Sequence, residues 1–322
     1  MLSTDLTRSL GLEVPIIGAP MSPMCGGRLA AALSNCGALG MIGVSSNQPI
    51  EQLDRDVAEY RSLAADRHFG IGLMVWAVDR RPELLDAVLR AKPFAVALSF
   101  GDPSKYVQRL REAGVRVFSQ VQDRVSALRA ESAGVDLVVA QGTDAGGHTG
   151  GVGTLPLLQI VLQSVRLPVV AAGGIATGRG LAAALAAGAQ GAWIGTPLLV
   201  SEEVRNSPRA RQALIAAKET ETIHTRVFDV VQGIAFPPSF PGRALANDFA
   251  RRWHGHESEL ARDEGAQQAF RQAKEAEDYS QAYIYAGQSV GLLERVEPAA
   301  QIVRRMVSEA EALLRAAAAL VV

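Results

Sequence analysis

The stretch QGTDAGGHTG at residues 141–150 places one histidine and one aspartate among four glycines. An imidazole titrates near neutral pH, so His148 can accept or donate a proton, or hold positive charge against an anion. A buried structural histidine needs neighbours to pack against, whereas these glycines leave backbone and open space around the ring. We therefore interpret His148 as a catalytic residue. Asp144 either orients His148 or caps the following turn, and the sequence does not decide between the two roles.

The other histidines are weaker candidates for a catalytic or metal-binding role. His68 precedes an expected strand and belongs at the opposite end of the fold, while His254 and His256 lie in a charged stretch and indicate a solvated surface. An H-x-H pair by itself is a weak metal signal, so we predict no metal site. His224 stays ambiguous.

Eight short apolar runs must position this site. They are continuous rather than alternating, which is typical of parallel strands covered on both faces. The runs span residues 15–20, 38–43, 69–75, 94–100, 115–121, 137–142, 168–174 and 191–196.

Helical patterns lie between these runs, at 49–65, 81–91, 103–114 and 177–189, with Gly114 and Gly188 as expected helix ends. Strand and helix thus alternate over about 200 residues, which predicts a (β/α)8 barrel. A doubly wound sheet is the alternative, but the G-x-G-x-x-G fingerprint that usually accompanies it is missing.

The chain changes character after residue 202. Residues 202–281 are rich in charged side chains and lack strand-like runs, and PPSFPGR at 237–243 interrupts a set of helical patterns. We predict a barrel over 1–205, a small helical domain inserted after strand 8 over 206–284, and a return to the barrel over 285–322 that ends in a helix.

The overall composition gives no support for nucleic-acid binding or for a membrane protein. The net charge of −1 gives no electrostatic footprint for nucleic acid, and the hydrophobic content of 48% is that of a soluble globular protein. The N-terminus lacks an apolar signal region, and the charge-free run Gly180–Ser201 is broken by glycines and a proline, so we expect no membrane span. Two cysteines suggest a reduced, cytoplasmic protein, in which Cys25 is more simply a buried filler than a reactive thiol.

Two glycine loops follow the last expected strands of the barrel. Loops at the carboxyl ends of these strands often bind phosphate, because glycines let the backbone approach an anion. Gly173, Gly174, Gly195 and Thr196 are therefore phosphate-binding candidates. The alternative is that these glycines only allow tight turns, but two adjacent loops favour phosphate.

The stretch around His148 can also receive a flat ligand. Gly146 and Gly147 leave room for an aromatic ring system, and amides at the ends of strands 5 and 6, Gln120 and Gln141, can hydrogen-bond the heteroatoms of a flavin-like ring. The alternative for both glutamines is an ordinary polar position on the barrel rim.

Four segments, in their order along the chain, resemble the nitronate monooxygenase family, once called 2-nitropropane dioxygenases. They are APM (19–21), AQGTDAGGHTGGVGTLPLL (140–158), VVAAGGIATGRGLAAALAAGAQGAWIGTPLL (169–199) and YAGQSVGLL (285–293). The resemblance implies a TIM barrel that binds FMN, with His148 matching the catalytic histidine. The FMN contacts that it implies are Ala19, Pro20, Met21, Gln141, Gly146, Gly174, Trp193, Ile194, Gly195 and Thr196. It also implies that Gln288 lies near the phosphate or the hinge of the inserted domain.

The resemblance implies oxidation of an alkyl nitronate by dioxygen, through FMN, to a carbonyl compound and nitrite. One departure bears on the substrate: Gly72 stands where many members carry asparagine near the flavin, with Trp76 close by. One alternative is an NAD(P)H-dependent FMN reductase of the enoyl-acyl-carrier-protein or quinone type, which also resembles this chain. Another is a barrel that binds a phosphorylated metabolite without flavin. A homodimer stays open.

Overall fold

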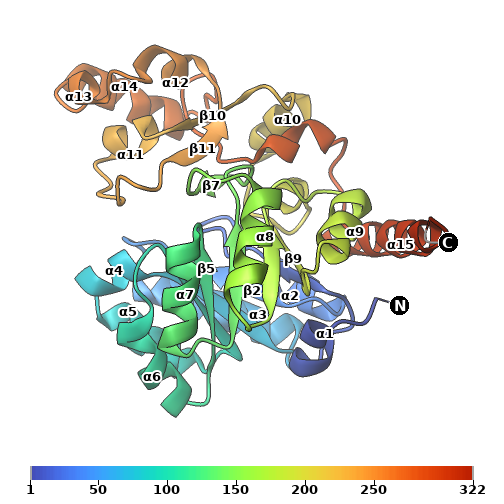
Figure 1. Cartoon of the computed structure of the whole chain (residues 1–322). Coiled ribbons are helices and arrows are strands. Elements are labelled where there is room, and N and C mark those ends of the chain that lie inside the picture. The colour runs from blue at the N-terminus through green and yellow to red at the C-terminus, as the bar shows by residue number, and fades with distance from the viewer. Residues whose placement is uncertain (1, 321–322) are drawn as a thin grey trace.

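Eight parallel strands form a nearly closed barrel in the computed structural model, which describes residues 2–320 (Figure 1). The strands are β1 (Ile16–Gly18), β2 (Gly40–Gly43), β3 (Phe69–Met74), β4 (Ala95–Ser99), β5 (Arg116–Val121), β6 (Leu137–Gln141), β8 (Val169–Ala172) and β9 (Gly191–Ile194). Neighbours in sequence pair in register around the barrel, and β9 pairs with β1. A parallel bridge between Ile17 and Leu39 joins β1 to β2.

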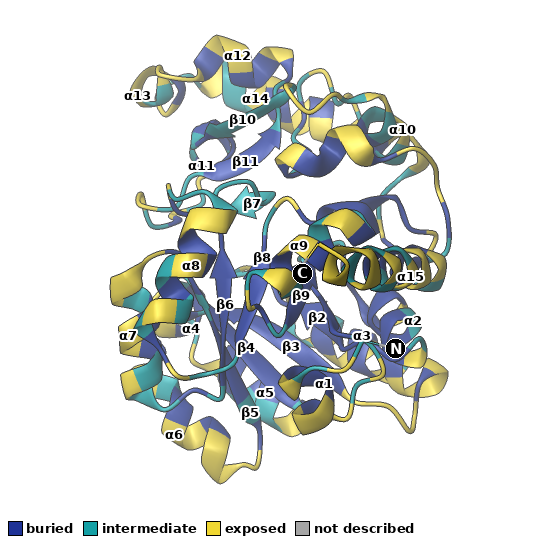
Figure 2. Cartoon of the chain, turned by 45° about the vertical axis from the view of Figure 1, so that its right-hand side comes forward, coloured by how far each residue is buried: buried dark blue, intermediate teal, exposed yellow. Residues whose placement is uncertain are grey.

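Each predicted apolar run contains one of these strands, so the predicted parallel barrel is confirmed and the doubly wound sheet is excluded. The runs are apolar along their length because both faces of each strand are buried, and Figure 2 shows these strands in dark blue. One face of the strands fills the barrel interior with side chains such as Met41, Phe118 and Trp193. The other face packs under the surrounding helices through residues such as Ile42 and Val138.

Helices cover the outside of the barrel, and the first of them also closes the end where the strands begin, because its Leu6 and Leu10 join the interior cluster. These helices are α1 (Asp5–Leu10), α2 (Gly27–Asn35), α3 (Ile50–Leu63), α4 (Val75–Arg80), α5 (Glu83–Ala91), α6 (Ser104–Glu112), α7 (Arg124–Ala133), α8 (Thr154–Ser164), α9 (Gly178–Ala186) and α15 (Ala299–Ala318). The helices predicted at 49–65, 81–91, 103–114 and 177–189 correspond to α3, α5, α6 and α9. Gly114 and Gly188 follow α6 and α9 within two residues, and both have positive φ, at 74° and 104°.

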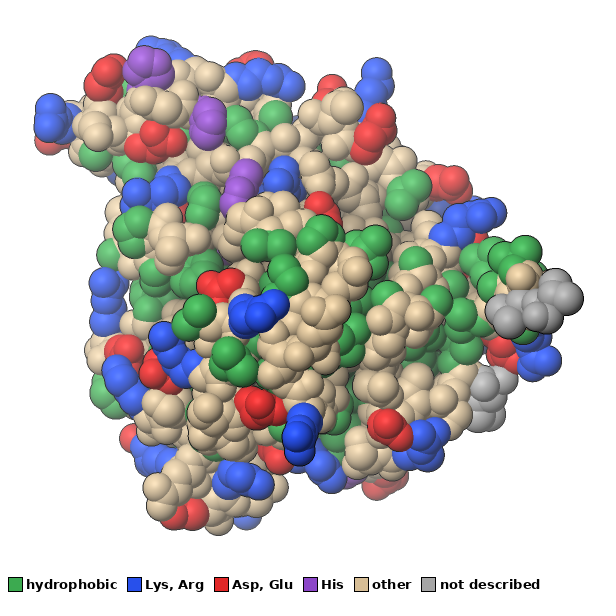
Figure 3. Space-filling model, viewed as in Figure 1, with side chains coloured by type: hydrophobic (Ala, Val, Ile, Leu, Met, Phe, Trp, Pro, Cys, Tyr) green, Lys and Arg blue, Asp and Glu red, His purple; other side chains and the backbone are tan. Residues whose placement is uncertain are grey.

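Residues 206–284, here called the cap segment, lie above the carboxyl ends of the barrel strands (Figure 1). This segment contains α10 (Pro208–Ala216), β10 (Thr222–Thr225), α11 (Val227–Gln232), β11 (Gly242–Leu245), α12 (Asp248–Trp253), α13 (Glu257–Leu260) and α14 (Glu264–Glu275). Short 3-10 helices, η1 (Thr196–Val200) and η2 (Gln288–Leu292), flank it. Acidic and basic side chains are interspersed over the face seen in Figure 3.

The expectation that this region lacks strands was wrong. β10 pairs antiparallel with β11, and β11 pairs antiparallel with β7 (Gly147–His148), which belongs to the glycine loop after β6. The sequences TIHT and GRAL are only four residues long and mix polar with apolar side chains, so no apolar run marks them. They become strands by pairing with each other, and β11 also pairs with the glycine loop.

The chain returns to the barrel through η2 and ends in α15, which packs against α9 and α2 as expected for the C-terminal helix. Ile302 and Met306 of α15 are buried in the layer between strands and helices. Residues 1, 321 and 322 of the predicted division lie outside the described residues. No helix within residues 2–320 combines the length and apolar character needed to cross a membrane.

Candidate active site

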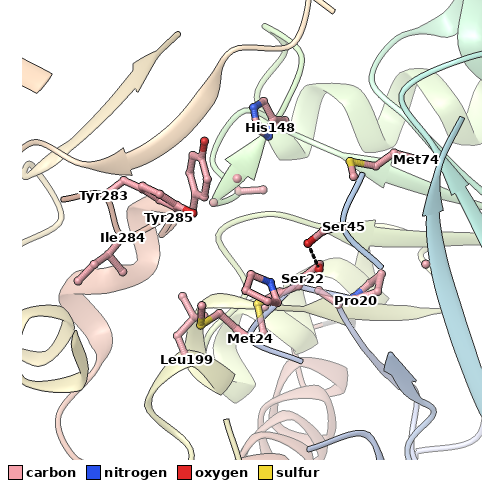
Figure 4. Close-up of a pocket in the computed structure, with 18 of the residues that line it drawn as sticks. Pro20, Ser22, Met24, Ser45, Met74, His148, Leu199, Tyr283, Ile284 and Tyr285 are labelled. Atoms are coloured by element: carbon pink, nitrogen blue, oxygen red, sulfur yellow. Dashed lines mark hydrogen bonds between the residues drawn. The ribbon is translucent and has the colours of Figure 1, made fainter. Parts of the chain in front are cut away.

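A cavity of about 1130 Å³ lies between the carboxyl ends of the strands and the cap segment. Figure 4 shows barrel residues such as Pro20 and Ser22 on one side and Tyr283 and Tyr285 on the other. The cavity is lined by every predicted site residue except Ile194 and Gln288: His148, Ala19, Pro20, Met21, Gln120, Gln141, Gly146, Gly147, Gly173, Gly174, Trp193, Gly195 and Thr196.

The two exceptions have clear positions. Ile194 is 1% exposed and lies in the apolar layer outside the barrel, because successive side chains of β9 point to opposite faces. The Gln288 side chain is exposed, while its backbone N–H donates to the carbonyl of Asp144 at 2.9 Å. Its neighbour Ser289 lines the cavity instead.

His148 is held by a carboxylate from the cap segment. Its Nε2 lies 2.9 and 3.0 Å from the two carboxylate oxygens of Asp229 in α11. The side chains of His148 and Asp229 are 13% and 5% exposed. Among the described residues, no group hydrogen-bonds to His148 Nδ1, so this nitrogen is open to a ligand.

Aromatic side chains surround the same imidazole. Phe236 stacks on it with ring centroids 3.4 Å apart, Phe100 meets it edge-on at 6.2 Å, and Tyr285 lies at 5.4 Å. Trp76 packs edge-on against Phe236 at 5.1 Å. Burial, together with the neighbouring Asp229, raises the pKa of Tyr285 well above its ordinary value, so this hydroxyl stays protonated. The imidazole of His148 therefore lies in a largely apolar wall of the cavity.

The two roles left open for Asp144 are resolved. Its Oδ2 accepts a hydrogen bond of 2.8 Å from the backbone N–H of Thr154, the first residue of α8. A carboxylate at that position satisfies one of the free N–H groups at a helix start. Asp144 makes no hydrogen bond to His148, so it caps the turn.

The two predicted glutamines keep free donors in the cavity. Gln141 Oε1 accepts a hydrogen bond of 3.1 Å from the buried Gln122, which leaves the amide N–H groups of Gln141 without an acceptor among the described residues. Gln120, half-buried, makes no side-chain hydrogen bond within the same part of the chain. Both amides can therefore pair with polar atoms of a bound ring.

The phosphate candidates present backbone donors. Within residues 2–320, the N–H groups of Gly174, Gly195 and Thr196 have no hydrogen-bond acceptor, and all three residues line the cavity. The first N–H of α9, from Gly178, is not available because it donates to Glu309 Oε2 at 2.8 Å. The loops, rather than that helix start, thus offer free N–H groups to an anion.

These residues fit a flavin nucleotide. Free N–H donors in the loops after β8 and β9 match a phosphate, and the free amides of Gln120 and Gln141 match the polar edge of a ring system. Between them, a Cβ added at Gly147 would meet nothing within 4 Å, so the backbone faces open space. Trp193, 5% exposed, closes the floor from the barrel interior.

Gly72, the departure from the family pattern, has a structural partner. A Cβ at this position would lie 2.3 Å from Cγ and 2.5 Å from Cβ of Pro20, which is itself a cavity residue. The Pro20 ring therefore occupies the space into which any side chain at position 72 would project. An asparagine at position 72 does not fit unless Pro20 also changes.

The remaining candidates have structural roles. The His224 Nε2 lies 2.8 Å from the carbonyl of Pro241, and burial lowers its pKa. His254 and His256 are exposed beside glutamates, and no cluster able to hold a metal occurs within residues 2–320. The Cys25 thiol donates to the carbonyl of Met41 at 2.8 Å, and burial raises its pKa to about 12, so it is a buried filler.

Sequence reasoning missed three residues that surround His148, namely Asp229, Phe236 and Phe100, whereas it had already noted Trp76 beside Gly72. Phe100 directly follows β4, so the rule that cavity residues follow the barrel strands was sufficient to find it. Asp229 lies 81 residues from His148 in a charged stretch, where nothing in the local pattern separates it from surface carboxylates.

Comparison with known proteins identifies the family to which the chain belongs. Residues 77–309 match the model of the family described as nitronate monooxygenase. A Staphylococcus aureus protein described as a probable nitronate monooxygenase is 31% identical over 268 residues, which cover 69% of this chain and 75% of that protein.

Solved structures show the same relationship. FabK from Thermotoga maritima is 31% identical and superimposes with a TM-score of 0.88 over the whole of both chains. A nitroalkane oxidase from Streptomyces ansochromogenes is 29% identical, with a TM-score of 0.81 over 97% of this chain and 99% of that one. The chain therefore belongs to the nitronate monooxygenase family, whose members are flavin-dependent oxidoreductases that act on small molecules.

Proposed function

We propose that this protein binds FMN and oxidises alkyl nitronates with dioxygen to carbonyl compounds and nitrite. The observation that carries the proposal is the position of His148, on the wall of the same cavity that holds the free phosphate and ring donors. We also propose that residues 1–205 form the cofactor domain, that 206–284 form a cap domain, and that 285–322 return to the barrel.

The residues that would hold FMN are the loop glycines Gly174 and Gly195 with Thr196 at the phosphate, and Gln120 and Gln141 at the ring. When bound, FMN supplies the electron acceptor for the substrate and the means to react with dioxygen. The protein supplies binding, orientation and electrostatics.

His148 acts on the substrate from the wall of the cavity. A nitronate is an anion, and a protonated imidazole whose Nε2 is compensated by Asp229 can bind it through Nδ1–H. For a neutral nitroalkane, the unprotonated Nδ1 can instead remove the α-proton. Phe236 and Phe100 keep water away, which strengthens either interaction.

The reductase alternative has its own support. FabK from Thermotoga maritima matches the full length of the chain with a higher TM-score than the nitroalkane oxidase does, and FabK enoyl reductases belong to the same family. In that reaction NAD(P)H would reduce the flavin, and His148 would donate a proton to the reduced acceptor.

Anaerobic mixing separates the two functions. The purified protein with its flavin is mixed with propyl-1-nitronate in one run and with NADH in another, while the flavin absorbance is followed. Bleaching by the nitronate with no response to NADH supports nitronate oxidation. Rapid bleaching by NADH with no response to the nitronate refutes it and supports the reductase.

The role of His148 is tested with a matched pair of variants. His148→Ala should lower kcat/KM for nitronate by about 10²- to 10⁴-fold, the contribution of a positioned acid–base group, while FMN remains bound. His256→Ala removes an exposed imidazole of the cap segment and should leave the rate unchanged. Equal rates in the two variants would exclude His148 from the reaction.

A further inference from the structure

The imidazole and the carboxylate that binds it come from different parts of the fold. His148 lies in β7, in the loop after β6, whereas Asp229 lies in α11 of the cap segment. Both carboxylate oxygens approach the same ring nitrogen, at 2.9 and 3.0 Å. The Asp229 side chain is 5% exposed, so little of it meets solvent.

This contact restricts where the imidazole carries its proton. An ionised carboxylate only accepts hydrogen bonds, so Nε2 facing Asp229 must carry a hydrogen. A neutral His148 is then the Nε2–H tautomer, with its lone pair on Nδ1. Nδ1 is also the ring nitrogen that has no partner among the described residues.

Packing fixes the ring in that orientation. Phe236 lies parallel to it at 6° with centroids 3.4 Å apart, and Phe100 meets it edge-on. The Tyr285 hydroxyl lies 3.5 Å from Asp229 Oδ1, on the same carboxylate. A 180° flip of the ring would place Cε1 where Nε2 now lies, and would separate Nε2 from the acceptors that it has among the described residues.

We propose that Asp229 is a positioning residue, which holds His148 as the Nε2–H tautomer so that Nδ1 is the atom that meets the substrate. The consequence for activity rests on the function proposed above, whereas the tautomer does not. Asp229 thereby makes the reactivity of a barrel residue depend on the position of the cap segment.

Other contacts already attach the cap segment to the barrel without the Asp229 carboxylate. The backbone ladder between β11 and β7 already joins the two parts, pairing Gly242 with His148 and Arg243 with Gly147. The Arg243 side chain adds a hydrogen bond of 2.7 Å from Nε to the carbonyl of Thr143. These contacts remain when Asp229 is changed.

The first test observes the tautomer directly. The protein with its flavin is labelled with [15N]histidine, and the His148 signals are assigned by their absence in His148→Gln. The unchanged protein should show neutral His148 with hydrogen on Nε2 alone. Asp229→Asn, which is nearly isosteric but introduces an amide donor, should lose that single tautomer.

The second test measures turnover in the same variants. Asp229→Asn should lower kcat by about 10²-fold, at the lower end of the contribution of a positioned acid–base group, with the flavin content and the melting temperature retained. Glu259→Gln makes the same change beside the exposed His256 and should alter neither tautomer nor rate. A retained tautomer or a retained kcat in Asp229→Asn overturns the proposal. If the unchanged protein oxidises no nitronate, the NMR result still decides the role of Asp229.

Discussion

Substituting Gly146 with alanine tests whether the glycine loop after β6 is packed as the cofactor cradle requires. A Cβ at this position would lie 2.6 Å from the carbonyl carbon of Ala286 and 2.6 Å from the nitrogen of Gly287. Real Cβ contacts are not this short, and both neighbours are backbone atoms, which cannot rotate away. The loop or the segment at 286–287 must therefore move.

The magnitude follows from the cost of overpacking a well-packed site, which is about 1–3 kcal/mol. At roughly 2.1 cal/mol/K per residue, a chain of 322 residues has an unfolding entropy for which each kcal/mol shifts the melting temperature by about 1.5 °C. Gly146→Ala should therefore lower the melting temperature by about 1.5–4.5 °C. Movement at Gly287 also loosens its hydrogen bond of 3.0 Å to Thr196 Oγ1, next to the proposed phosphate site.

Loosening of this hydrogen bond, which holds Thr196 at the proposed phosphate site, should weaken FMN binding by about fivefold, since a hydrogen bond contributes about 1 kcal/mol net. The assay is a fluorescence titration of the flavin-free protein with FMN, beside a thermal melt. Gly151→Ala is the matched control: it lies in the same loop, has no positive φ, and has nothing within 4 Å of an added Cβ. If Gly146→Ala and Gly151→Ala behave alike in both assays, the reasoning about close packing is refuted.

Three further changes test other contacts of the site. Gly72→Ala should lower the free energy of unfolding by about 1–3 kcal/mol, because the added Cβ collides with the Pro20 ring. Adding Pro20→Ala should recover most of that loss in a denaturant titration. If the double variant stays as unstable as Gly72→Ala, another neighbour is responsible. Phe100 has a φ of 59°, a strained value for an aromatic residue. Phe100→Gly should therefore keep or raise the melting temperature, while loss of the ring from the cavity raises KM for nitronate. A lower melting temperature with an unchanged KM would contradict both the strain and the role of the ring in the site. Burial raises the pKa of Cys25 from 9.0 to about 12, so the folded protein should resist alkylation of this thiol at pH 8–10. The free energy of unfolding should fall as pH rises from 9 towards 12, because the thiol ionises in the unfolded chain and stays protonated in the folded one. Rapid labelling of Cys25 in the native protein, detected by mass spectrometry, would contradict its burial.

The barrel could be predicted from the sequence because its information is local. Each strand is buried on both faces, so apolar residues follow one another without a break at 137–140 of the run 137–142, and helices such as α3 repeat their apolar residues at helical spacing. Glycine loops after successive strands are equally visible, because parallel strands bring their carboxyl ends to one edge wherever they lie in the chain. This is why His148, Gly174 and Thr196 could be placed in one cavity before the fold was known.

What tertiary structure alone decided is the surroundings of these residues. Asp229 and Phe236 lie in the cap segment, which meets the glycine loop where β11 pairs with β7. The strands of that small sheet are too short and too mixed to show a pattern. Local signals cannot encode a contact whose two sides lie 81 residues apart, since it depends on how the cap segment folds over the barrel. The glycines and the histidine thus identify the site, while the folded cap determines which nitrogen of the imidazole is free to act.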